Sequence, residues 1–406
     1  SSENYERRFI MTFPNETLPK GRKQKTTALY DRFVSMGAVM GDSFGLESVL
    51  WFADKPADAY EEPTIKRSRS HEYVSKEVKN VRENVGVIEV ANFSKHEFQG
   101  PDARKFLDYI LAGRIPKPGR ICLNPMLTPK GKLYGDLTVA CLNENRFIIF
   151  GSGAVQEMHR RWFESHLKDF NVVYKNRSDD FHGLALSGPK SRELLQKLVR
   201  ENISNENFKF RDVKEMYVAG VPAIVNRISF TGELGYEIYV APQFLLKLFE
   251  EMELVGKEFG LKPFGGRALM SMRLEKNWGA WTLDYRPDFT AKESSLDVFI
   301  NWNKEFIGKE SAKKDNSNLK LTPLIVETDD IDVCNNEAVM KDGKSIGYVT
   351  SGGFAHYVNK SIAFSYLDKN ILNSDKKIQV EINGNFYNCL IIKEPLYDPS
   401  GKKMRN

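Results

Sequence analysis

Two acidic residues lie within predicted apolar strands, where a carboxylate lowers stability unless it is hydrogen-bonded or functional. Asp136 is the first of them. It lies between Gly135 and an apolar run that predicts a strand. Acidic residues are disfavoured inside strands, and a buried carboxylate costs stability unless it is hydrogen-bonded or functional. In a cleft, such a group acts as a general base or stabilises a cation. The alternative on the motif alone is a structural Asp that caps a turn.

Glu237 is the second, and it follows a glycine turn in the segment Ser229-Phe230-Thr231-Gly232-Glu233-Leu234-Gly235-Tyr236-Glu237-Ile238. A carboxylate that accepts two parallel N–H bonds can recognise a guanidine-like edge, such as that of a pterin or of guanine. Phe230 offers an aromatic ring that can stack on such a group. The alternative is an edge-strand Glu in solvent.

Other chemistries leave weaker marks in the chain. Gly151-Ser152-Gly153 follows a predicted strand, but Gln156 stands where a dinucleotide-binding loop has its third glycine. Neither a phosphate loop nor a nucleophile elbow is present. His159 and His166 lie on one predicted helix without a third ligand, so we predict no metal site.

Composition and length narrow the class of protein. The 406 residues include 59 Lys and Arg against 54 Asp and Glu, and this net charge of +5 is too small to favour a nucleic-acid partner. Four Cys without C-x-x-C spacing indicate the reduced thiols of a cytoplasmic protein. We predict no membrane span and no signal peptide. The chain starts without Met, as expected of a processed chain or of one that begins partway into a longer protein.

The order of the predicted elements indicates an α+β protein with two related lobes. Apolar spacing predicts helices, each accompanied by strands, over 102–112, 155–167, 191–200 and 244–259. After a polar linker, six short strands separated by turns such as Asp342-Gly343 predict a small β-barrel. We therefore divide the chain into an arm (1–70), a central region of two lobes (71–180 and 181–315) and a C-terminal barrel (316–406).

Residues 1–70 show no regular pattern apart from a short helix predicted over 29–36. Pro56 and Pro63 interrupt regular structure, and residues 20–25 form a basic run. We expect this segment to be an arm that wraps over another part of the structure. A solvated linker is the alternative.

Several segments together resemble a known family. Residues 230–237 and 267–276 are similar to folate-dependent aminomethyltransferases, the T-protein of the glycine cleavage system, and more closely to the C-terminal half of dimethylglycine and sarcosine dehydrogenases. Further matching segments are 126–131, 306–309, 350–353 and 393–396. Residues 5–8 and 27–31 resemble the segment that joins the flavin domain to the folate domain in those dehydrogenases.

The resemblance implies two α+β lobes and a terminal β-barrel, arranged like a cloverleaf around a central folate channel. It implies that Asp136 is the catalytic residue near the reacting nitrogens of tetrahydrofolate and that Glu237 binds the pterin. Arg273 is expected near the folate, paired with Glu237 or with a folate carboxylate. The other cofactor-binding residues that it implies are Phe210, Phe230, Tyr236 and Trp281. Phe230 and Leu123 stand where the T-protein has Tyr, and Trp278 and Trp281 follow Arg273, where the T-protein has a Tyr. These departures favour the dehydrogenase branch.

The implied activity is one-carbon transfer. A flavin oxidises an N-methyl amine of the dimethylglycine or sarcosine type, and the methylene group passes to tetrahydrofolate to give methylene-tetrahydrofolate. Because the sequence shows no flavin fingerprint, FAD is expected only on a missing N-terminal domain or on a partner subunit, with the basic run at 20–25 as a candidate contact.

Two alternatives remain open. One is a folate-dependent methyltransferase or demethylase that acts on a betaine or a sulfonium. The other is a non-catalytic, folate-binding regulatory module. The presence of Asp136 together with Glu237 favours catalysis.

Overall fold

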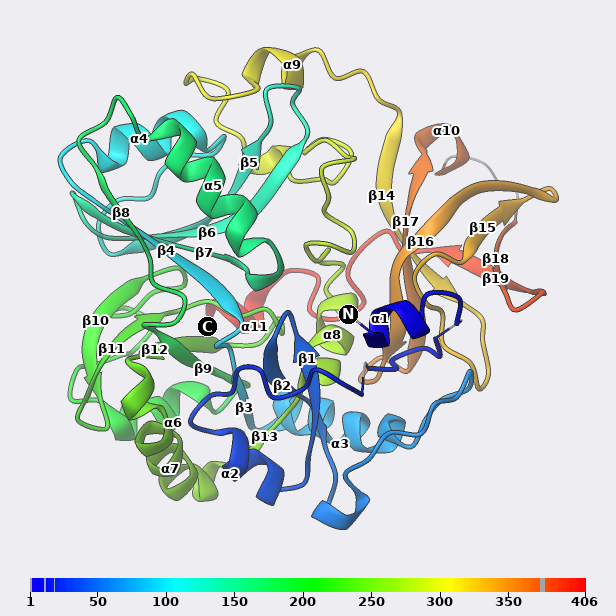
Figure 1. Ribbon diagram of the computed structural model, residues 1–406, viewed down its shortest axis with the longest axis horizontal. Coiled ribbons are helices and arrows are strands. Elements are labelled where there is room, and N and C mark those ends of the chain that lie inside the picture. Colours follow the sequence, from blue (N-terminus) through cyan, green and yellow to red (C-terminus); the bar gives the residue numbers. More distant parts are fainter. Residues whose placement is uncertain (1, 11, 18, 373–376) are drawn as a thin grey trace.

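Three bodies surround a central region in the computed structural model, which describes residues 2–10, 12–17, 19–372 and 377–406 (Figure 1). They are a five-stranded sheet, a six-stranded sheet and a closed barrel. The predicted α+β class with a C-terminal barrel is confirmed. Residues 1, 11 and 18 of the predicted arm and 373–376 of the predicted barrel lie outside the described residues.

The five-stranded sheet is antiparallel and carries Asp136. In spatial order, its strands are β5 (Arg120–Leu127), β6 (Leu133–Asn143), β7 (Arg146–Ser152), β4 (Phe93–Gln99) and β8 (Val173–Asn176). Leu137 of β6 packs with Phe106 of α4 (Ala103–Ile110) and Phe163 of α5 (Gln156–His166). Since successive strand residues alternate between faces, Asp136 lies on the face away from these helices.

The six-stranded sheet carries Glu237. In spatial order, its strands are β10 (Val213–Val218), β11 (Val221–Asn226), β12 (Gly235–Val240), β9 (His182–Ser187), β3 (Val85–Glu89) and β13 (Leu261–Pro263). Helices α6 (Ser191–Leu198) and α7 (Leu245–Gly256) cover one face, where Leu195 and Phe249 share a core with Ile238 of β12. The division of the two lobes at residue 180 stays a prediction. Strand β3, before this boundary, pairs with β9, after it.

The N-terminal segment is more regular than expected, so the prediction of an irregular arm is wrong for its second half. Helix α2 (Tyr30–Ser35) is followed by a hairpin of β1 (Ala38–Ser43) and β2 (Leu46–Phe52). Trp51 of β2 is wholly buried in a cluster with residues of α3 (Ser70–Glu83) and α8 (Gly266–Glu275). Burial of one hairpin face makes this segment part of the core. The basic run is also engaged, because Arg22 pairs with Glu47 of β2 (2.7 Å).

A buried ionic network holds the glycine turn that precedes Glu237. Arg82 of α3 donates to Glu233 (2.9 Å) and to Glu275 of α8 (2.5 Å), and all three side chains are inaccessible or nearly so. The Tyr397 ring lies 3.7 Å from the Arg82 guanidinium carbon, and its hydroxyl donates to Glu233. Because removing one partner would leave an uncompensated buried charge, the network fixes the turn against α3 and α8.

The C-terminal barrel forms as the sequence predicts. In spatial order, its strands are β14 (Leu319–Val326), β17 (Lys360–Asp368), β16 (Lys344–Ala355), β15 (Ala338–Lys341), β18 (Ile378–Ile382) and β19 (Asn385–Ile391). Asp342-Gly343 and Asn383-Gly384 turn two hairpins with positive φ at all four residues. That geometry suits the right-handed twist of paired strands and explains why these dipeptides mark the turns.

The four cysteines all have free thiols. In the part of the chain that the structure describes, no helix combines the length and apolar character that crossing a bilayer requires.

Candidate functional site

Asp136 occupies a recess on the inward face of β6. Its side chain is partly exposed, yet the surrounding protein atoms desolvate the carboxyl group and raise its pKa to about 7. A group that solvent reaches but that protein surrounds lies in a concave site. A carboxyl with a pKa near neutrality takes up and releases protons at the pH at which enzymes work.

The irregular segment after α8 carries Tyr285, whose phenol lies within electrostatic range of Asp136. Burial raises the pKa of the Tyr285 hydroxyl, and the nearby negative charge of Asp136 raises it further. The Tyr285 oxygen accepts a hydrogen bond from the backbone N–H of Gly279 (3.2 Å), which fixes the ring. Tyr285 was not among the residues expected in the site.

Arg273 pairs with Asp284. The expected ion pair between Arg273 and Glu237 is therefore wrong. Its guanidinium donates to Asp284 (2.9 Å) and to the backbone oxygen of Trp278 (2.9 Å), and both charged side chains are buried. Asp284 also accepts from Thr350 (2.5 Å) and Ser351 (2.7 Å) of the barrel. Arg273 therefore fixes the segment 278–285 between α8 and the barrel. A folate contact of Arg273 stays a prediction.

The expected aromatic residues do not form one wall. Phe230 stacks on Trp278 with ring centroids 5.9 Å apart and stays partly exposed. Trp281 is 8% exposed and packs in one cluster with Tyr285, which places it on the Asp136 side. Phe210 is partly exposed just before β10, and its backbone oxygen accepts from Arg120 (3.2 Å). Folate contacts of these three rings stay predictions.

Glu237 faces inward from β12 beside a neighbouring phenol and an amide. Tyr239 donates to Glu237 Oε2 (2.9 Å), and Asn226 lies directly opposite Glu237 in the β11–β12 register. Burial raises the pKa of Glu237 to about 7, against the lowering by these polar neighbours. Within the described residues, both polar atoms of the buried Asn226 amide lack a hydrogen bond of acceptable geometry. The pair therefore has unused hydrogen-bonding capacity.

Tyr236 does not share this site, which corrects its expected role. It precedes Glu237 on β12 and therefore points to the opposite face of the sheet. There it is wholly buried in the core under α6 and α7, with its ring centroid 5.8 Å from that of Phe208. Because successive side chains of a strand point to opposite faces, Tyr236 and Glu237 cannot both face the same layer.

A contact between two aromatic rings connects the sheet that carries Asp136 to the sheet that carries Glu237. Thr138, two residues beyond Asp136 on the same face of β6, lies opposite Phe150 of β7. The Phe150 ring stacks on the Tyr239 ring at 4.6 Å and 27°. Because Tyr239 donates to Glu237, the two carboxylates face one layer between the two sheets.

Sequence reasoning missed Tyr239, Asn226 and Tyr285. Tyr239 lies two residues from Glu237, so strand alternation could have placed both on one face. Asn226 and Tyr285 left no comparable signal, because the β11–β12 register and an irregular segment bring them to the site.

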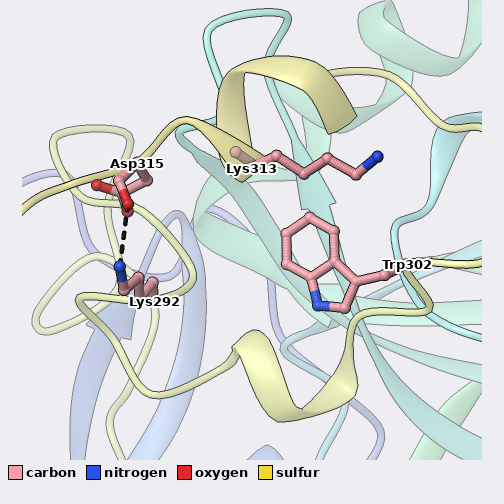
Figure 2. Close-up of a pocket in the computed structure, with 5 residues that line it drawn as sticks. Lys292, Trp302, Lys313 and Asp315 are labelled. Atoms are coloured by element: carbon pink, nitrogen blue, oxygen red, sulfur yellow. Dashed lines mark hydrogen bonds between the residues drawn. The ribbon is translucent and has the colours of Figure 1, made fainter.

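Two hollows elsewhere contain neither carboxylate. One, of about 350 Å³, lies beside α9 (Lys309–Lys313) and is lined by Lys292, Trp302, Ala312, Lys313 and Asp315. Figure 2 shows Lys292 turned to Asp315, to whose backbone oxygen it donates (3.0 Å). The other, of about 160 Å³, lies between the N-terminal segment, α8 and the barrel, with His71 and His356 in its wall. Among the described residues, no group of three His, Cys, Asp or Glu side chains is arranged to hold a metal ion.

The lack of a side chain at Gly183 leaves space for the Tyr239 ring. Adding one methyl group there is therefore expected to destabilise the fold. A Cβ at Gly183 of β9 would lie 2.7 Å from the Tyr239 ring. Gly183→Ala should therefore lower the free energy of unfolding by about 1–3 kcal/mol, measured by urea denaturation. Gly266→Ala is the control, because its Cβ would come no closer than 3.5 Å to the nearest atom beyond its own helix. Equal stability of the two variants would contradict tight packing around Tyr239.

Comparison with known proteins shows which family the chain belongs to. The model of the GCVT N-terminal domain matches residues 29–304, and that of the glycine cleavage T-protein C-terminal barrel domain matches 320–398. Human mitochondrial dimethylglycine dehydrogenase is 34% identical over 97% of this chain, which spans 46% of that relative's length. An aminomethyltransferase of Desulfitobacterium hafniense is 29% identical, with 93% of this chain and 99% of the relative aligned.

A solved structure agrees on the fold. The glycine cleavage system aminomethyltransferase T from Bartonella henselae superposes with a TM-score of 0.80 at 20% identity, covering 93% of this chain and 99% of that one. The family match implies tetrahydrofolate binding and folate-dependent one-carbon transfer. The chain therefore belongs to the glycine cleavage T-protein family.

Proposed function

We propose that this chain accepts the methylene group of an oxidised N-methyl amine, of the dimethylglycine or sarcosine type, on tetrahydrofolate. The observation that carries the proposal is the pair Asp136 and Glu237, which face one layer from two different sheets. The similarity to dimethylglycine dehydrogenase, at 34% identity, supports the choice of amine.

The residues around Glu237 fit a pterin edge, which carries adjacent N–H donors and a carbonyl acceptor. The Glu237 carboxylate accepts from N–H groups, and the Asn226 amide directly opposite it carries both a donor and an acceptor. Glu237 keeps 8% of its surface exposed. Phe230, partly exposed against Trp278, supplies an aromatic surface.

Asp136 is suited to the proton that the transfer releases. Bound tetrahydrofolate would supply the nitrogens that become bonded to the carbon. When an iminium carbon leaves its amine for two N–H groups, the amine regains one proton and a second proton is left over. Asp136 in its ionised form takes that proton, and its negative charge stabilises cationic species beforehand. Water would hydrolyse the iminium to formaldehyde, so the transfer needs a site that excludes water.

The oxidation itself requires a flavin, and we propose that an FAD-dependent domain or subunit performs it. Folate-dependent transfer from a betaine or a sulfonium is the second candidate, because the same two carboxylates would serve it. A purely regulatory folate site would have no use for a carboxyl group with a pKa of about 7 in the recess.

The proposal is tested by calorimetric titration of the chain with tetrahydrofolate, followed by assay of methylene-tetrahydrofolate formed from a supplied iminium donor. Binding together with transfer supports it. Binding without transfer favours the regulatory reading, and the absence of binding contradicts both.

A further inference from the structure

Lys95 is a buried cation that the reaction above does not use. It lies on β4 directly opposite Phe150 of β7 and has no exposed surface. Its ammonium group donates to the backbone oxygen of Ala91 (2.9 Å). Burial lowers its pKa to about 7. A lysine in such a place costs stability, because its charge is removed from water without a directly paired carboxylate.

The position of Lys95 connects it to the proposed pterin site. Its Nζ lies 5.7 Å from the centroid of the Tyr239 ring, on whose face Phe150 also stacks. The same Tyr239 donates its hydroxyl hydrogen to Glu237 (2.9 Å). A cation near an aromatic face is attracted to it, so Lys95 stabilises the ring orientation that brings the hydroxyl to the carboxylate.

We propose that Lys95 is a positioning residue for Glu237: its buried ammonium lies behind the Tyr239 ring, whose hydroxyl donates to Glu237, and it supports the carboxylate that accepts N–H bonds from a ligand. This inference rests on the proposed function, since it concerns how the same site is made ready for tetrahydrofolate. Lys95 acts through Tyr239 and through its field, without touching the ligand.

The surrounding charges leave this role to Lys95. Asp179 and Glu89 raise its pKa and Lys25 lowers it, while Lys25 and Asp179 form an ion pair with each other. His182 of β9 has a pKa lowered by burial to about 4 and is neutral at physiological pH. Among the described residues, Lys95 is the one cation whose charge lowers the pKa of Glu237.

The test is tetrahydrofolate affinity between pH 6 and 9 for the wild type and for Lys95→Gln, which keeps a donor for Ala91 and removes the charge. If Glu237 loses its cation, its pKa should rise above about 7. Affinity should then fall severalfold at pH 6.5 and hardly change at pH 9. Lys117→Gln, at an exposed site, should match the wild type. A loss that is equal at every pH would mean a purely structural role and would overturn the proposal.

A second measurement separates this inference from the proposed function. The free energy of unfolding is measured across the same pH range for the wild type, Glu237→Gln, Lys95→Gln and the double variant. The quantity of interest is the stability difference that Glu237→Gln causes, once with Lys95 present and once with Gln at position 95. With Lys95, the difference should stop growing near pH 7, the pKa of Glu237. With Gln at position 95, the difference should keep growing to a higher pH. Identical curves would refute the coupling whether or not tetrahydrofolate binds. Absence of binding alone would refute the proposed function.

Discussion

Replacing Asp136 by Asn is expected to leave tetrahydrofolate bound and to lower the rate of one-carbon transfer by roughly 10²–10⁴-fold, the usual contribution of a general base. Asn fills the same recess and retains hydrogen bonding, but it cannot accept the proton that the transfer releases. The measurement is the single-turnover rate of methylene-tetrahydrofolate formation at saturating tetrahydrofolate, with affinity determined separately by calorimetry.

Asp169→Asn is the matched control, because Asp169 is exposed and lies after α5, outside the site. It should transfer at the wild-type rate. An Asp136→Asn variant that also does so would remove Asp136 from the chemistry. If instead its rate loss came with an equal loss of folate affinity, Asp136 would be a binding residue and not a base.

The raised pKa of Asp136 gives two pH signatures of opposite sign. The transfer rate should rise with pH and level off above about pH 7, where the carboxyl is ionised. Stability should do the reverse, because the folded pKa lies above the unfolded one and its favourable contribution is lost as pH rises through about 7. Asp136→Asn should therefore be more stable than the wild type, by a margin that grows from pH 4 to pH 7. Thermal unfolding at pH 5 and pH 8 measures it.

Replacing Glu237 by Gln is expected to weaken tetrahydrofolate binding by roughly 10²-fold, or about 3 kcal/mol, because two hydrogen bonds to a charged acceptor are lost or weakened. Gln still accepts from Tyr239, so the fold should persist. One of its two polar atoms is a donor that would face the N–H groups of the pterin. Calorimetry of the variant with tetrahydrofolate measures the effect.

The control for Glu237 is Glu250→Gln on the exposed surface of α7, which should bind like the wild type. Binding by Glu237→Gln at the wild-type affinity would contradict the pterin assignment. Because burial raises the pKa of Glu237 to about 7, the variant should also be more stable than the wild type at pH 8.

Local patterns were sufficient to predict much of the fold. The barrel was predictable because its turns need left-handed backbone, which Asp342-Gly343 and Asn383-Gly384 adopt readily. The β1–β2 hairpin was missed although Leu46, Val49 and Trp51 are buried on it. Prolines on its C-terminal side and a basic run on its N-terminal side are typical of irregular structure, and they flank this short apolar pattern.

The candidate site was predictable only in part, for a physical reason. Asp136 and Glu237 were found because a carboxylate inside an apolar strand is unusual in itself. Their partners come from other strands, and register decides them: Asn226 opposite Glu237, and Phe150 between Thr138 and Tyr239. Lys95 could not have been found, since a lysine on a strand is ordinarily exposed and only the packed structure buries it.

The central claim is direct passage of a methylene carbon to tetrahydrofolate, and isotope dilution tests it most directly. An N-methyl amino acid such as dimethylglycine, labelled with ¹³C in its methyl groups, is oxidised by a flavin-dependent dehydrogenase in the presence of this chain, tetrahydrofolate and excess unlabelled formaldehyde. The account predicts methylene-tetrahydrofolate that keeps its ¹³C enrichment, and diluted label with Asp136→Asn. Label diluted to the level of the formaldehyde pool with the wild-type chain would contradict it.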